Sequence, residues 1–536
     1  MNKINRRTTS RPRDEKQSKD RFPIFGIFYL TALHLEISQG WKSPAIGLVS
    51  LVLLLVIVYS KINLLKFCLF IVLDTAYYLF FHFPEVANHV NLIIFCNLSM
   101  LCVAIYSWLS PSRSLEQYYQ AIASPLRMSL IVVYIGAGFH KLNQDFLNPY
   151  VSCSHSMLAE IIEMLSSTLV RIPILLILGA ISLLFIKKII PKNWVRKGRG
   201  SKFFLISLGL LVALITFVGA IYYFNKAHLF FLTFVLATSM MVLFWELLGG
   251  MLLFFPRWQA SMFFLSMLMH LILSPIGFVD FGSLAFALWL TFIPNHYWLL
   301  SETINIPLVA SVDRSLFYVS INVFGGLIGE IYYFVNPNFN LQAFIGILFI
   351  ASVFIVIAPL VKKLLADPHS WQGVRVINSK MPKFMYLFVA ALIIYAATSY
   401  LGLRTAGNFS MFSNLRTEGE TSNHLLLSHH PFKIWNYQED VVKVIEIDDR
   451  KAKVGHKYRP LKDHYLPVVE FRKLIYKWTQ AGYTVPLVFE YGDRTYRTAD
   501  IVNDPVWRTP KRNWEMALMD FRVIQPDNGE PNYCRW

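Results

Sequence analysis

The sequence predicts a polytopic α-helical membrane protein of about 11 to 13 transmembrane or interfacial helices, with a small C-terminal extracytoplasmic domain of α/β or mostly β structure. The first observation behind this prediction is composition. Of the 536 residues, 55% are hydrophobic and only 15% are charged, whereas soluble proteins carry about 25% charged residues. The second is a series of membrane-length apolar runs between residues 22 and 403. The third is a change beyond residue 403 to shorter, strand-like runs.

The N-terminal segment is strongly basic. Residues 1–21 contain eight Lys and Arg residues against three acids, so we expect a disordered cytoplasmic tail. The first apolar run is not followed by a small-residue cleavage site, which is why we expect the tail to be retained rather than removed as a signal peptide.

The apolar runs define the candidate membrane helices. They are residues 22–38, 43–60, 64–83, 91–110, 127–141, 171–188, 203–222, 229–255, 258–275, 283–300, 317–334, 342–362 and 384–403. The first run contains His34 and Glu36, which leaves a position in the membrane interface open for it. We divide the chain after the tail into a helical membrane domain, additional transmembrane helices and a C-terminal domain, namely residues 22–300, 301–403 and 404–536.

Basic loops predict the orientation of these helices. Residues 187–202 contain seven basic residues and no acid, and residues 362–383 are also basic. Loops enriched in Lys and Arg lie on the cytoplasmic side. Six candidate helices lie between the tail and the first basic loop, and six lie between the first basic loop and the second. Both numbers are even, so the tail and both loops lie on the same side. We therefore expect an inner (cell) membrane protein with a cytoplasmic N-terminus and with residues 404–536 outside.

The C-terminal region has a different pattern. Runs rich in β-branched residues predict strands at Val441–Ile447, Val485–Tyr491 and Asp520–Ile524. Between them, Val469–Tyr483 has helical periodicity. This mixture predicts a small folded domain rather than a further membrane segment.

The net charge of the chain bears on its binding partners. The formal charge of +17 is a topological signal in a membrane protein. Because no nucleic-acid-binding motif accompanies it, we expect the lipid bilayer as a partner and no nucleic acid.

Cys153 and Cys534 both fall on the predicted outer side, where disulfides persist. A bond between them and two free thiols are both open.

Residues 131–147, IVVYIGAGFHKLNQDFL, are the most informative stretch. The small residues at Gly136, Ala137 and Gly138 allow another helix to approach closely. Lys141 near the end of this apolar helix is either an anchor that reaches to the interface or a functional amine. His140 stands beside it, and two more polar residues follow, which is more polar chemistry than an anchor requires.

Other polar residues interrupt apolar runs. Asn88 and His89 precede one such run, where Asn is a favoured helix N-cap. Glu246 lies inside FWELLGG, and a carboxylate within a membrane helix usually has a function or a partner. His270 is either part of a site or a hydrogen-bonded core histidine. The predicted topology brings His89, Lys141 and His270 toward the same outer face.

Three of these blocks resemble a known family. YIGAGFHKLNQDFL is similar to the signature of the HTTM (horizontally transferred transmembrane) domain, which is shared with vitamin K-dependent gamma-carboxylase. The matching positions are Ala137, Gly138, Lys141, Leu142, Asp145 and Phe146. ANHVNLIIF resembles the family's Asn-His pair, and the block from WELLGG to FGSLAF resembles its acidic, arginine, histidine and aromatic block. The resemblance covers roughly residues 20–300 and is closest to bacterial members.

The resemblance implies a chemistry. Lys141 takes the position of the base that deprotonates vitamin K hydroquinone, and His89 that of a histidine near the quinone. The hydroquinone anion reacts with oxygen, and the resulting strong base removes a γ-proton from a glutamate, whose carbanion captures carbon dioxide. The implied cofactor is reduced vitamin K or menaquinone, with oxygen and carbon dioxide as co-substrates. The candidates for quinone binding are Asn88, His140, His270 and Glu246. We assign no metal site.

Residues 401–427 resemble a block found beside this domain in bacterial members. Arg416, Glu418 and His424 in this block are candidates for a second site, and the alternative is a linker packed on the membrane face.

The expected function is a quinol-dependent oxygenase or carboxylase acting at the extracytoplasmic face on an unknown protein or small-molecule acceptor. Two alternatives remain open, a transporter or lipid-handling protein, and a non-catalytic anchor for residues 404–536.

Overall fold

The computed structural model describes most of the chain. The described residues are 21–40, 44–109, 114–166, 228–298, 303–306, 309–336, 340–366, 371–419, 421–428, 433–448, 452–509, 513–526 and 530–534. The predicted loop 187–202 and the candidate helices 171–188 and 203–222 lie outside them. The predicted tail does too, except for its last residue. Arg21 is buried and forms an ion pair with Glu116.

Helices dominate the described residues. Seven are long and apolar enough to cross a membrane: α3 (Leu64–Phe81), α4 (Asn88–Trp108), α5 (Leu115–His140), the continuous run through α11 (His228–Leu243) to α12 (Gly250–Leu252), α13 (Pro256–Leu273), α15 (Arg314–Val335) and α16 (Leu341–Ala366). Four shorter apolar helices are α1 (Phe22–Gly40), α2 (Pro44–Tyr59), α14 (Val279–Trp289) and α17 (Met385–Ala396). This architecture fits the predicted helical membrane protein.

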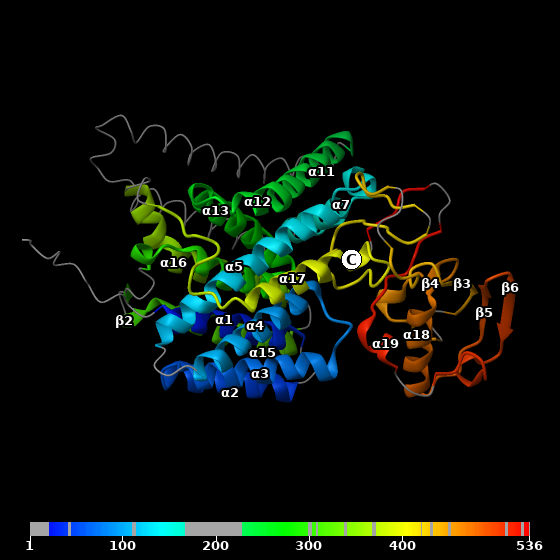
Figure 1. Ribbon diagram of the computed structural model, residues 1–536, viewed down its shortest axis with the longest axis horizontal. Coiled ribbons are helices and arrows are strands. Elements are labelled where there is room, and N and C mark those ends of the chain that lie inside the picture. The colour runs from blue at the N-terminus through cyan, green and yellow to red at the C-terminus, as the bar shows by residue number, and fades with distance from the viewer. Residues whose placement is uncertain are drawn as a thin grey trace, which may run out of the picture.

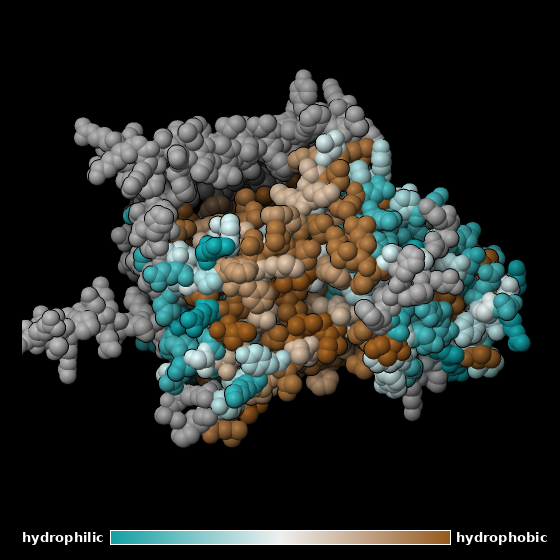
Figure 2. All heavy atoms as spheres, turned by 45° about the horizontal axis from the view of Figure 1, so that its top comes forward, coloured by the Kyte–Doolittle hydropathy of each residue, from teal (hydrophilic) through white to brown (hydrophobic). Residues whose placement is uncertain are grey.

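The helices form one block, with the C-terminal sheet beyond one end of it (Figure 1). On the face shown in Figure 2, hydrophobic side chains cover the middle of the molecule, and hydrophilic side chains gather at the left end of the helical block and over the C-terminal region at the right. Large apolar side chains are exposed on several helices, for example Phe80 on α3 and Ile331 on α15. An uninterrupted apolar surface of this kind is unfavourable in water and suits a lipid environment.

Helix α1 is packed among the other helices of the block. Phe22, Phe25 and Phe28 are fully buried, and α1 packs against α14, α2 and α15. Helix α5 begins at Leu115 rather than at the predicted residue 127. Ser114 and Gln117 form a capping box at its start, which satisfies two backbone N–H groups there.

The C-terminal region contains a four-stranded antiparallel sheet in the order β4–β3–β5–β6. The strands are β3 (Val441–Glu446), β4 (Tyr465–Pro467), β5 (Leu487–Tyr491) and β6 (Arg494–Thr498), with α18 (Val468–Gln480) and α19 (Trp514–Leu518) beside them. Two predicted strands and the predicted helix are confirmed. The strand predicted at Asp520–Ile524 is wrong, because that segment forms only an isolated bridge between Ile524 and Tyr465.

Four further elements belong to the described structure. Strands β1 (Thr303–Ile306) and β2 (Val309–Asp313) form a hairpin, and α6 (Gln144–Leu147) and α7 (Cys153–Ser166) follow α5. Cys153, the first residue of α7, is joined to Cys534 by a disulfide. This bond links the loop after α5 to the end of the C-terminal region, while Cys68, Cys96 and Cys102 are free.

Residues 401–427, here named the covering segment, cross the ends of α4 and α5 without regular structure. The Asn88 side chain accepts a hydrogen bond from the Phe409 backbone N–H, and the Asn143 side chain donates one to the Ser413 carbonyl (2.5 Å). Gly407 has φ +76°, a conformation that glycine adopts without strain. The covering segment therefore closes the end of the helical block that carries the predicted site.

An ionic cluster fastens the C-terminal region to the helices. Glu85, in the loop between α3 and α4, contacts Lys473 (3.5 Å) and Lys477 of α18. Lys473 also contacts Glu470 (2.8 Å) and Asp520 (3.3 Å). Burial raises the pKa of Glu85, but the ammonium groups around it lower the pKa more, so the net shift is downward. The pKa of Asp520 is also held below its ordinary value, because Lys457, Lys473 and Arg404 outweigh its burial.

This cluster predicts a loss of stability in acid. A carboxylate with a lowered pKa stabilises the folded state above its ordinary pKa, and this contribution disappears as pH falls through the folded-state value. The ordinary values are 4.5 for Glu85 and 3.8 for Asp520. We expect the melting temperature of the purified protein to fall once pH drops below about 4.5. Glu85→Gln should weaken that acid dependence. An unchanged melting temperature at pH 3 would contradict the assignment.

Candidate functional site

Lys141 and Glu246 form a buried ion pair. Lys141 caps the C-terminal end of α5, and its Nζ lies 3.0 Å from Oε1 and 2.8 Å from Oε2 of Glu246. The relative exposures of the two residues are 5% and 7%. A lysine that anchors a helix extends its amine to water. The Lys141 amine points to a carboxylate instead, so the anchoring interpretation is wrong.

Small residues bring the two helices together at this point. A Cβ atom at Gly138 would lie 2.6 Å from the Leu247 backbone nitrogen, so no larger residue fits there without moving the backbone. On the opposite helix, a Cβ at Gly250 would lie 2.9 Å from the Ile135 side chain. The close approach expected from the glycines of α5 is present, and it places the backbone of the turn that carries Glu246 against α5.

Glu246 lies in a π-helical turn, Phe244–Gly249, within the run from α11 to α12. Such turns are rare and occur frequently at functional sites. The same turn directs Phe244 and Leu248 outward, where they are 55% and 40% exposed. Glu246 therefore faces the protein interior, while its neighbours on the same turn face the apolar outer surface.

The side chain of His140 binds Tyr400, the residue just before the covering segment. Its Nδ1 lies 2.9 Å from the Tyr400 hydroxyl, and the two rings are stacked. Asn143 hydrogen-bonds the His140 carbonyl (2.8 Å) and caps α6 through the Phe146 N–H (2.8 Å). Asp145 accepts a hydrogen bond from Asn423 (2.7 Å). These groups fix the covering segment on the end of α5.

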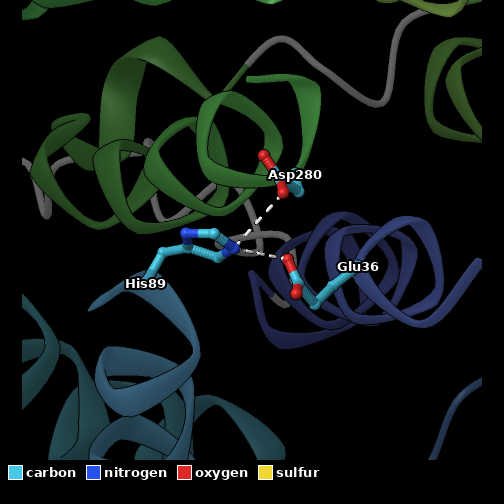
Figure 3. A group of neighbouring side chains, drawn as sticks. All are labelled: Glu36, His89 and Asp280. Atoms are coloured by element: carbon cyan, nitrogen blue, oxygen red, sulfur yellow. Dashed lines mark hydrogen bonds and ion pairs between the residues drawn. The ribbon is translucent and has the colours of Figure 1, made fainter. Parts of the chain in front are cut away.

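His89 forms a second buried centre with two carboxylates. Its Nε2 lies 2.8 Å from Glu36 Oε2 and 3.3 Å from Asp280 Oδ2. Figure 3 shows this nitrogen pointing between the two acids, which come from α1 and α14 while His89 comes from α4. One interpretation expected Asn88 to cap α4, and it is wrong. The N-cap residue is Ala87, which makes no side-chain cap. The Asn88 side chain binds the covering segment instead.

His270 is a hydrogen-bonded core histidine, the simpler of its two interpretations. Its Nε2 lies 3.0 Å from the Tyr134 hydroxyl, which accepts a hydrogen bond from Trp289 Nε1 (3.0 Å). The Phe281 ring lies 5.0 Å from the His270 ring and 6.0 Å from the His89 ring, centroid to centroid. The Phe281 ring therefore contacts both histidines.

The second-site candidates separate into two groups. Arg416 and Glu418 line a small pocket together with Arg522, and the pKa of Arg522 is lowered by burial, with Glu418 opposing the shift. His424 has a structural role. Its Nε2 lies 2.9 Å from the Phe139 carbonyl, and its Nδ1 accepts from the Leu426 N–H (3.2 Å).

Of the predicted residues, Lys141 and Glu246 form one buried pair, and His89 belongs to a second centre with Glu36 and Asp280. Across the residues that the structure describes, no hydrogen bond or ion pair joins one centre to the other. Both lie beneath the covering segment, which binds Asn88 next to one centre and Asn143 next to the other. Sequence reasoning missed Asp280, although an aspartate within the apolar run PIGFVDFGSLAF was a usable signal.

Comparisons with known proteins identify no relative. No protein-family model matches the chain, and no curated protein or solved structure matches it. A function must therefore be inferred from the chemistry of the two buried centres.

Proposed function

We propose that the protein is an integral membrane enzyme that deprotonates a lipid-soluble quinol, with Lys141 as the base. In this proposal it is a quinol-dependent oxygenase of the HTTM, vitamin K-dependent gamma-carboxylase-like type. The observation that carries the proposal is the buried pair of Lys141 and Glu246 at the end of α5. The quinol would be reduced vitamin K or menaquinone, which reaches the site from the bilayer.

Glu246 supplies what a lysine base requires. A protonated ammonium cannot accept a proton, so the amine must first lose one. Glu246 is the carboxylate within hydrogen-bond distance that can take it. In an apolar interior an ion pair and its neutral form are closer in energy than in water, because burial penalises both charges. The neutral amine then accepts the proton of a quinol hydroxyl.

The quinol anion then reacts with oxygen. Quinol and oxygen give a quinone epoxide and water, with one oxygen atom in each product. If the protein is also a carboxylase, the strong base formed on this path removes a C–H proton from an acceptor, and carbon dioxide adds to the carbanion. The pocket lined by Arg416, Glu418 and Arg522 contains the cationic side chains that an anionic acceptor requires. His89 is the candidate for stabilising the quinol anion through Nδ1, because its Nε2 faces Glu36 and Asp280.

The disulfide supports an extracytoplasmic C-terminal region. Cys153 and Cys534 are bonded, and disulfides persist in oxidising compartments and are rare in the cytoplasm. We therefore expect a reporter that is active only in the cytoplasm to be silent when it is fused after Trp536. A reporter fused ahead of the chain should be active. An active C-terminal fusion would contradict the orientation.

The experiment that tests the function measures the epoxide. Purified protein in detergent or nanodiscs is incubated with reduced menaquinone or reduced vitamin K and oxygen, and the products are identified by mass spectrometry. We expect quinone epoxide in amounts that depend on the enzyme, and His89→Ala should lower the rate by about 100-fold. A folded protein that forms no epoxide would favour the alternative of a transporter or lipid-handling protein.

A further inference from the structure

In the Glu36–His89–Asp280 centre, two carboxylate oxygens face one imidazole nitrogen, which cannot donate a hydrogen bond to both. A ring nitrogen carries at most one hydrogen and donates one strong hydrogen bond. Nε2 of His89 nevertheless lies 2.8 Å from Glu36 Oε2 and 3.3 Å from Asp280 Oδ2. All three atoms lie within 4.8 Å of one another, and Figure 3 shows them converging on one point.

We propose that these three side chains bind a divalent first-row transition metal ion. Imidazole nitrogen and carboxylate oxygen bind such ions at about 2.0 to 2.2 Å. Ligands at angles of about 90° to 110° then lie about 2.8 to 3.6 Å from one another. Both distances from His89 Nε2 fall within this range. One nitrogen and two carboxylate ligands are a donor set that suits Mn²⁺, Fe²⁺ or Zn²⁺.

Charge balance favours the ion. Two carboxylates and one imidazolium carry a net charge of −1, whereas two carboxylates, a neutral imidazole and a divalent ion are neutral. Buried charges are stable when they are paired or bind metals.

The groups around the three ligands hold them in orientation. Asp280 Oδ1 accepts a hydrogen bond from the Phe281 N–H (2.6 Å), which leaves Oδ2 directed at His89. The Tyr78 hydroxyl hydrogen-bonds Glu36. Metal-binding carboxylates are held in this way by neighbouring donors. The side chains of Glu36 and Asp280 retain 11% and 17% exposure, which leaves a route for an ion to enter.

The second acidic group of the described residues provides a contrast. Glu85, Glu470 and Asp520 also converge within 4.8 Å. There, however, the amines of Lys457 and Lys473 contact two or more of the three acids. Lysine ammonium groups already supply the positive charge at that position. At the Glu36–His89–Asp280 centre, no ion pair with a lysine or arginine is present among the described residues.

Metal binding is tested without any quinol, so its outcome is independent of the proposed function. The purified full-length protein is stripped with a chelator, dialysed, and titrated with Mn²⁺, whose free aqueous form is followed by electron paramagnetic resonance. We expect one saturable site per chain. Asp280→Asn and Glu36→Gln keep the side-chain shape but remove a charged ligand, and we expect each to weaken binding by at least about tenfold.

Glu246→Gln is the matched control, because it removes a different buried carboxylate and should leave Mn²⁺ affinity unchanged. Competition with Zn²⁺ at the same stoichiometry would support the site. The absence of saturable Mn²⁺ binding to the folded wild-type protein would overturn the proposal, whatever the variants do. Unchanged affinity in a folded Asp280→Asn protein would also overturn it.

Discussion

We expect Lys141→Arg and Lys141→Ala both to reduce epoxide formation by about 10²- to 10⁴-fold, the range for the loss of a general base. The arginine variant is the more informative of the two. Its guanidinium keeps a positive charge beside Glu246, so the buried pairing and membrane insertion are preserved. A guanidinium stays protonated, however, and cannot accept a proton from the quinol. Turnover is measured from the epoxide, and insertion from the membrane fraction.

Two controls separate catalysis from structure. Lys141→Ala leaves the Glu246 carboxylate buried without its partner, which is costly. The double variant Lys141→Met with Glu246→Gln removes both charges and should fold normally while remaining inactive. Lys66, a half-buried lysine in the first turn of α3 whose amine binds Ser60 and Lys61, should tolerate replacement by alanine or arginine without loss of turnover. A small neutral amine should restore part of the activity of Lys141→Ala. Full activity in Lys141→Arg would refute the base assignment.

The local part of this site was predictable from sequence. Gly138 and Lys141 stand in one short stretch, and the spacing of small residues indicated a close helix contact. The structure contains that contact at the Leu247 backbone. The C-terminal helix α18 was predictable for a similar reason, because its apolar face repeats at the helical period and is buried at Phe471, Leu474 and Trp478.

The partners of these residues were not predictable in the same way. Glu246 was noted because burying a carboxylate in an apolar run costs free energy. Its partner Lys141 lies 105 residues away, and no periodic pattern links positions on different helices. Glu36 and Asp280 meet His89 only because the last turn of α1 lies beside the first turns of α4 and α14. The role of Asn88 was missed for the opposite reason. A favourable local capping preference was overridden by a contact 321 residues away with Phe409.

Gly138→Ala should reduce epoxide formation by about 100-fold, although it adds only one methyl group. The new Cβ would lie 2.6 Å from the backbone nitrogen and 2.9 Å from the Cα of Leu247. A backbone cannot rotate away as a side chain can, so α5 and the π-helical turn must separate by about 1 Å, a displacement that can cost about 100-fold in rate. Overpacking of this kind also destabilises by about 1 to 3 kcal/mol.

Gly136→Ala is the matched control on the same helix. Its Cβ would meet only the Ala396 side chain, at an ordinary contact distance of 3.5 Å. Both substitutions bring the same gain in helix propensity, about 0.5 to 1 kcal/mol, so the difference between them isolates the contact with Leu247. We expect Gly136→Ala to keep wild-type turnover and thermal stability. Equal activity in the two variants would mean that the spacing of Lys141 and Glu246 does not limit the reaction, which would count against their acting as a pair.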